Sequence, residues 1–88
     1  MIEVELRLFG SFRRYSDTPS VIIRLPEKCT VHACKEIIAQ ELRRLRPEFG
    51  AGDLVFASAL ADDKAILQDR DEIQSSCTLA ILPPVCGG

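Results

Sequence analysis

Residues 2–9 read Ile2-Glu3-Val4-Glu5-Leu6-Arg7-Leu8-Phe9, in which apolar and charged side chains alternate. Successive side chains of a β-strand point to opposite faces of the sheet. Four aliphatic residues would therefore share one face, while Glu3, Glu5 and Arg7 would share the other. This pattern predicts a half-buried strand, with one face on the core and the other in water.

A second strand is predicted at residues 20–25, where Val21, Ile23 and Leu25 are in phase and Pro26 ends the strand. Residues 10–19 between the two strands begin with Gly10 and end with Pro19, which predicts a loop. Two adjacent strands joined in this way indicate an antiparallel hairpin with a long turn.

A helix is predicted after Thr30, which can cap its amino terminus. The apolar residues that follow recur at helical spacing: Val31, Cys34, Ile37, Ile38, Leu42 and Leu45. Three arginines, at positions 43, 44 and 46, occur in the last turn, where positive charge suits the helix dipole, and Pro47 ends the helix. We interpret the arginines as a solvated helix end, with an acidic docking partner as the alternative.

The second half of the chain predicts three further strands. Residues 54–61 are interpreted as a central strand that is apolar on both faces, and Asp62 and Asp63 as a turn leading to a short returning strand at 64–67. Residues 68–72 are predicted to form an exposed connection, with Ile73 anchored in the core beneath it. Residues 78–82 form the last strand.

This order of elements predicts an α+β protein with one sheet packed on one helix. The last strand would lie most economically beside the first and parallel to it. That arrangement is the ubiquitin-like β-grasp fold, a mixed sheet of about five strands packed on one main helix. We predict a β-grasp domain at residues 1–82 and a flexible diglycine tail at residues 83–88.

Composition excludes several classes of function. The 88 residues carry a net charge of −2, with 11 basic and 13 acidic side chains, so nothing suggests binding to nucleic acid. No apolar run is long enough to span a membrane, and no leader precedes the first strand, so we expect a cytoplasmic protein without membrane contact. Four cysteines without a C-x-x-C pair, and a single histidine, His32, predict neither a disulfide framework nor a metal site. No phosphate-binding glycine motif and no catalytic triad are present, so we expect no bound cofactor.

The chain ends in Leu82-Pro83-Pro84-Val85-Cys86-Gly87-Gly88. Pro83 and Pro84 stiffen this segment toward an extended form, whereas Gly87 and Gly88 carry no side chains and allow another surface to approach the main chain closely. The segment is therefore interpreted as a stalk that carries the Gly88 carboxylate into the active site of another protein. The alternative is an ordinary frayed terminus.

This tail resembles that of the small subunit of molybdopterin synthase and its relatives, which end in a PPV-x-GG sequence. The segments Val4–Gly10 and Asp69–Gln74 are also similar to that family, and the resemblance spans essentially the whole chain. The chain departs from the family pattern in two places. Ser75-Ser76-Cys77 replaces a Gly-Asp type turn, and Cys86 stands where a small residue without a thiol is more usual.

The resemblance implies a sulfur carrier. An E1-like adenylating enzyme would use ATP to activate the Gly88 carboxylate, which has a pKa of about 3.5 and is otherwise a poor electrophile. A persulfide donor would then convert it to a thiocarboxylate. The large synthase subunit would use this sulfur on a cyclic pterin precursor in molybdenum cofactor biosynthesis. The carrier would have no catalytic groups of its own.

The same resemblance implies roles within the tail. Gly87 would allow the narrow approach to a partner's active site, while Pro83, Pro84 and Val85 would set the length and direction of the tail. Cys86 is interpreted as a small residue rather than a redox group. An exposed apolar sheet face, with Ile22 and Phe56 as candidates, would dock the partners. The tail alone does not distinguish this function from a ubiquitin-like protein modifier, or from a sulfur carrier for thiamin or tRNA thiolation.

Overall fold

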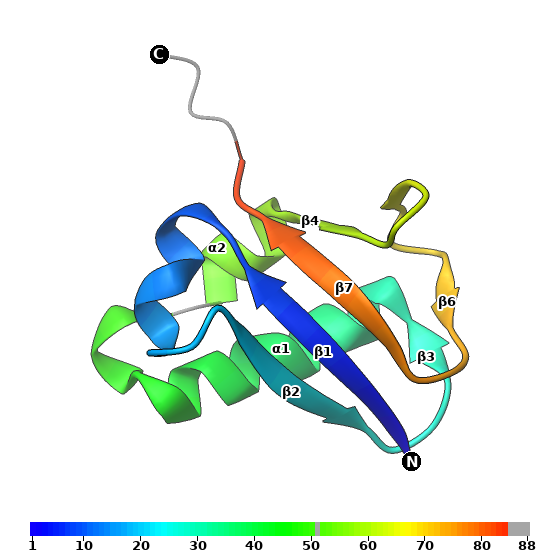
Figure 1. The fold of residues 1–88 in the computed structure, drawn as a ribbon, viewed down its shortest axis with the longest axis horizontal. Helices are drawn as coiled ribbons and strands as arrows, with labels where there is room; N and C mark the ends of the chain where they lie inside the picture. Colours follow the sequence, from blue (N-terminus) through cyan, green and yellow to red (C-terminus); the bar gives the residue numbers. More distant parts are fainter. Residues whose placement is uncertain (51, 85–88) are drawn as a thin grey trace.

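A five-stranded mixed sheet covered on one face by a long helix forms the protein (Figure 1). The computed structural model describes residues 1–50 and 52–84. The strands of the main sheet lie in the order β2-β1-β7-β4-β5. Their bounds are β1 Ile2–Leu8, β2 Ser20–Leu25, β4 Ala59–Ala61, β5 Ile66–Leu67 and β7 Cys77–Leu82. The helices are α1 Val31–Leu45 and α2 Gly52–Ala57, with 3₁₀ turns η1 Gly10–Tyr15 and η2 Pro47–Phe49.

The two strands predicted as a hairpin pair as expected. β1 and β2 are antiparallel from Ile2 opposite Leu25 to Arg7 opposite Ser20. The last strand, β7, lies on the other side of β1 and runs parallel to it, from Val4 opposite Cys77 to Leu8 opposite Ile81. Both the hairpin and the parallel placement of the last strand are therefore confirmed, as is the β-grasp arrangement.

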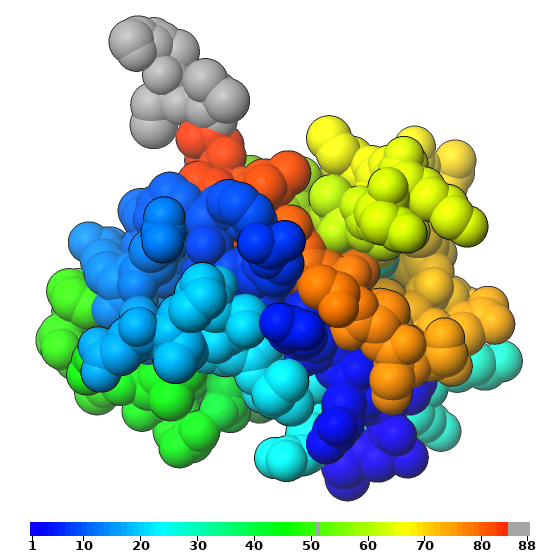
Figure 2. Space-filling view, in the orientation of Figure 1, coloured from blue at the N-terminus to red at the C-terminus, as the bar shows by residue number. Residues whose placement is uncertain are grey.

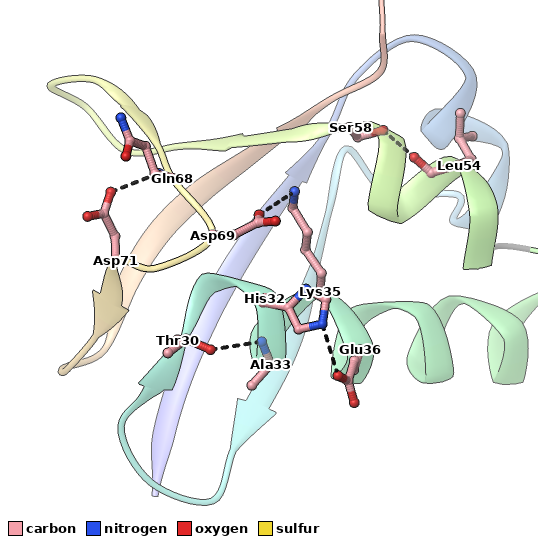
Figure 3. Close-up of polar contacts among 10 residues, drawn as sticks. All are labelled: Thr30, His32, Ala33, Lys35, Glu36, Leu54, Ser58, Gln68, Asp69 and Asp71. Atoms are coloured by element: carbon pink, nitrogen blue, oxygen red, sulfur yellow. Dashed lines mark hydrogen bonds and ion pairs between the residues drawn. The ribbon is translucent and has the colours of Figure 1, made fainter.

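The core lies between the sheet and α1. The alternation in β1 is complete, because Ile2, Val4, Leu6 and Leu8 are buried while the residues between them are exposed. From the helix, Val31, Cys34, Ile38, Ala39 and Leu42 are buried against them. Thr30 caps α1 as predicted, since its hydroxyl oxygen accepts a hydrogen bond from the Ala33 amide at 3.1 Å (Figure 3).

The prediction of one central strand over residues 54–61 is wrong. Its first half, residues 54–57, lies in α2, and only Ala59–Ala61 enter the sheet, as β4, between β7 and the edge strand β5. A short apolar run is compatible with either a buried strand or a short helix, and periodicity alone does not separate the two. The helix ends where the Ser58 amide donates to the carbonyl of Val55 and the Ser58 hydroxyl donates to that of Leu54 (Figure 3).

A second, two-stranded sheet was not predicted. β3, Cys29–Thr30, pairs antiparallel with β6, Glu72–Ile73. Ile73 is buried, which confirms it as the core anchor below an exposed connection. The expected loop at 10–19 begins with η1, which buries Phe12 and Tyr15. Within residues 1–50 and 52–84, no helix has the length and apolarity needed to cross a bilayer.

Candidate functional site at the base of the tail

The tail begins where β7 leaves the sheet, beside the end of β1. Pro83 is half-buried and Pro84 is exposed. Figure 2 shows the red surface at the end of β7 against the blue surface of the residues that follow β1. Of the predicted site residues, Val85, Cys86, Gly87 and Gly88 lie outside the described part of the chain, so their flexibility and their roles stay predictions.

Pro83 packs against Gly10, the first residue of η1. A Cβ atom placed on Gly10 would lie 2.7 Å from Cγ of Pro83, well inside normal contact distance. Gly10 also has a φ of +57°, a conformation that residues with side chains rarely adopt. The sequence resemblance includes Gly10 at the end of its first segment, but nothing in the sequence indicated that it contacts the tail.

The open face of the sheet is mixed in character. Its β1 and β2 side carries Glu3, which lies 3.3 Å from the guanidinium of Arg24, and Glu5, which accepts a hydrogen bond from the Ser20 hydroxyl. Ile22 is 49% exposed opposite Glu5, so its prediction as an exposed apolar residue of this face is confirmed. Most of the exposed residues on this side are charged or polar, so the prediction of an exposed apolar sheet face is wrong for β1 and β2.

Phe56 does not belong to this face, which corrects its prediction. It is 43% exposed, but it lies on α2, where its ring is 5.5 Å from that of His32. The apolar group nearest the end of β1 is Phe9, which is 38% exposed and has the Arg7 guanidinium 5.7 Å from its ring centre.

The described thiols are poor nucleophiles. Cys34 is fully buried, and this burial raises its pKa to about 12. Burial also raises the pKa of Cys29 and of Cys77, with smaller contributions from Glu27 and Asp62 respectively. Cys77 is nevertheless exposed. A thiolate is the reactive form of cysteine, so we place no chemistry on these three residues.

An acidic groove of about 560 Å³ lies at the other end of β7, lined in part by Asp62, Asp63, Glu72 and Cys77. One of its carboxylates, that of Asp62, has a structural role. The Asp62 carboxylate accepts hydrogen bonds from the amides of Lys64 and Ala65, both at 2.8 Å. These two donors hold the pKa of Asp62 below its ordinary value and form the turn predicted from the sequence.

The remaining polar contacts stabilise the fold. His32 is exposed and lies 3.4 Å from Glu36 on the next turn of α1. The Lys35 amine, almost fully buried, lies 3.1 Å from the Asp69 carboxylate (Figure 3). Across residues 1–50 and 52–84, no group of three or more His, Cys, Asp or Glu side chains could hold a metal ion. The described residues thus offer a packed base for the tail, where Pro83 meets Gly10.

A five-stranded mixed sheet on one main helix, with a proline-led tail extending from the central strand, defines a ubiquitin-like β-grasp protein. No protein-family model matches the chain. Nearly the whole chain is related to the molybdopterin synthase sulfur carrier subunit of Arabidopsis thaliana. The two are 28% identical over 87 residues, which is 99% of this chain and 84% of that protein.

Solved structures show the same fold. SAMP1 from Haloferax volcanii superposes with a TM-score of 0.69 and 18% identity, covering 98% of this chain and 99% of its own. A putative molybdopterin converting factor, subunit 1, from Pyrococcus furiosus gives a TM-score of 0.67 and 22% identity, covering 97% and 100%. The resemblance predicted from the tail, the first strand and residues 69–74 is therefore confirmed.

Proposed function

We propose that this chain is the sulfur carrier subunit of a molybdopterin synthase. One observation carries the proposal: the chain is similar over almost its full length to a protein named as that subunit, and it ends in the Pro83-Pro84-Val85-Cys86-Gly87-Gly88 segment.

The chemistry follows from the terminal carboxylate. As an anion with a poor leaving group, it does not exchange oxygen for sulfur unaided. Adenylation by an E1-like enzyme with ATP supplies AMP as the leaving group, and the outer sulfur of a persulfide donor displaces AMP at the acyl carbon of Gly88. A thiol reductant then cleaves the S–S bond of the resulting acyl disulfide, which releases the thiocarboxylate and leaves the donor and the reductant joined by a disulfide. The large synthase subunit receives the resulting thiocarboxylate in its active site, where the sulfur passes to the cyclic pterin precursor. Cytoplasmic localisation belongs to this same proposal.

Intact mass spectrometry tests the charging step. The full chain is incubated with an E1-like adenylating enzyme, ATP and a persulfide donor, and exchange of one oxygen for sulfur should add about 16 Da. Because oxidation of a cysteine or methionine adds nearly the same mass, the shift must be located by fragmentation on Gly88. Omitting ATP should abolish it.

Two variants test the need for the exact chain end. Deletion of Gly88, or extension of the chain by one residue, should leave thermal unfolding unchanged and should abolish sulfur transfer to the pterin precursor. The reaction requires the acyl carbon at one place, and a misplacement of about 1 Å already costs ~10²-fold in rate. Transfer by the Gly88-deleted chain at the wild-type rate would refute the proposal.

Protein modification is the second candidate function, because one of the solved structures with this fold is described as small archaeal modifier protein 1. The same adenylated tail would then be attacked by a lysine amine, and the product would be an isopeptide-linked adduct. Tail-dependent adducts in the presence of the activating enzyme, without a gain of sulfur at Gly88, would favour this alternative. A sulfur-bearing Gly88 that no synthase large subunit accepts would instead favour thiamin or tRNA thiolation.

A further inference from the structure

The contact between Gly10 and Pro83 continues the pairing of the two central strands. β1 and β7 pair in parallel with a constant offset, and the last pair is Leu8 with Ile81. Two residues further along each strand, the same offset places Gly10 beside Pro83. Proline has no amide hydrogen, so it cannot extend the ladder by a hydrogen bond. The register is continued by packing of the proline ring on the glycine backbone.

Only glycine fits at position 10, for two independent reasons. The positive φ disfavours any residue with a Cβ atom. The space that a Cβ would occupy is taken by the Pro83 ring, with Cγ at 2.7 Å and Cδ at 3.5 Å. Gly50 provides a comparison within the same chain, because its φ of +58° is nearly identical but no atom lies within 4 Å of its built Cβ.

Rigid structure holds Gly10 in place on both sides. Before it, the Leu8 amide donates to the Pro19 carbonyl at 2.9 Å. After it, η1 is fixed by Phe12 and Tyr15, which are 0% and 1% exposed. The Tyr15 hydroxyl also donates to the carbonyl of Gly50 at 3.0 Å. The Pro83 ring therefore packs on a backbone segment that is held by hydrogen bonds and by buried side chains on both sides.

We propose that Gly10 is a positioning residue for the tail: it seats Pro83 and so fixes where the chain leaves the sheet on its way to Gly88. This role rests on the proposed function, because it matters only if the acyl carbon must reach a partner's active site. A Cβ at position 10 would have to push the Pro83 ring from 2.7 Å to at least 3.4 Å, the ordinary contact distance. That shift is similar in size to the misplacement of about 1 Å that costs ~10²-fold in rate.

The test compares Gly10→Ala with Gly50→Ala in the full chain. Both variants place alanine at a positive φ, so both should lower the midpoint of thermal unfolding. Only Gly10→Ala should lower the rate of sulfur transfer, by about tenfold or more. The loss should appear in kcat at saturating partner, since the docking surface is unchanged. A nuclear Overhauser contact between the α-protons of residue 10 and the Pro83 ring should be present in the wild type and weaker in Gly10→Ala. This contact measures the packing of Pro83 on residue 10 without a sulfur-transfer assay.

Pro83→Ala completes a double-mutant cycle and does not strain position 10. It removes the ring atom nearest Gly10, so it should slow transfer several-fold by itself. On this background Gly10→Ala should cause little further loss, because the atom with which it clashes is gone. Two results would overturn the role of Gly10. One is a double variant whose transfer rate falls by the product of the two single losses, and the other is an equal transfer rate for Gly10→Ala and Gly50→Ala. A wild-type chain that cannot be charged at Gly88 would instead refute the proposed function, so the two failures are distinguishable.

Discussion

Removal of the Asp69 carboxylate should destabilise the protein more than removal of the Lys35 charge. Lys35 is 6% exposed, and its amine lies 3.1 Å from a carboxylate oxygen of Asp69, whose side chain is 63% exposed (Figure 3). The two partners therefore have unequal environments. Asp69→Ala leaves an ammonium in an almost buried position without its counter-ion, whereas Lys35→Met removes the charge and keeps most of the aliphatic packing.

Two limits set the size of the effect. A solvent-exposed ion pair contributes about 0–1 kcal/mol, whereas breaking a fully buried pair costs about 3–5 kcal/mol, because one charge is left uncompensated. Water can reach the exposed side of this pair and replace part of the lost interaction. We therefore expect Asp69→Ala to cost about 1–2 kcal/mol. In a domain of this size, each 1 kcal/mol lowers Tm by about 4–8 °C. Lys35→Met should change stability by less than about 0.5 kcal/mol.

Thermal and urea unfolding of the three variants Asp69→Ala, Lys35→Met and Asp63→Ala would measure the difference. Asp63 is an exposed turn residue whose side chain makes no hydrogen bond or ion pair among the described residues, so its variant controls for the loss of one surface carboxylate. The reasoning would be refuted by a Lys35→Met variant as unstable as Asp69→Ala, or by Asp69→Ala unfolding at the same temperature as Asp63→Ala. Charging at Gly88 should be unaffected in all three.

Three other measurements probe the thiols and the support of the tail base. Alkylation of the folded protein at pH 8 should label exposed Cys77 and spare Cys34, as measured by peptide mass mapping. Cys34 is protected by its complete burial and by its pKa of about 12. Equal labelling of the two cysteines would contradict the fold. Tyr15→Phe removes the hydrogen bond to the Gly50 carbonyl and should cost ~1 kcal/mol of stability. In a thermal melt, this loss should lower Tm by about 4–8 °C. An unchanged Tm would show that the hydrogen bond contributes nothing to stability. Cys86→Ser should accept and donate sulfur at a near-normal rate and keep its charged form longer under oxidising storage, as followed by intact mass; a variant that cannot be charged would show that the thiol takes part in the reaction.

The elements with clear periodicity were predictable from the sequence. The apolar alternation of β1, the helical spacing from Val31 to Leu45 and the Thr30 cap all appear in the structure with small changes of boundary. Burial of one face of a strand or helix leaves a repeated signal in the sequence. The parallel placement of β7 was predictable for a different reason, since few topologies place these elements around one core.

Other elements left no such signal. α2 has six residues, too few for the apolar positions Leu54 and Val55 to show a period, and its apolar content favoured a strand. β3 and β6 have two residues each, and they exist because chain segments more than forty residues apart meet at Cys29 and Ile73. The role of Gly10 was hidden for the same reason, because its neighbour Pro83 is distant in sequence and adjacent only through the pairing of β1 with β7.

The position of the tail depends on the register of the two central strands. A slip of one residue between β1 and β7 would move the start of the tail by about 3.3 Å along the strand, several times the ~1 Å tolerance expected at a reacting centre. It would also turn each side chain of the slipped strand to the opposite face. For β1, that would bury Glu3, Glu5 and Arg7 and expose the aliphatic residues that now fill the core. The energy that holds β1 in register therefore also holds Gly10 beside Pro83. Under the proposed function, the hydrophobic core would thus contribute to the reaction by fixing the point from which Gly88 is delivered.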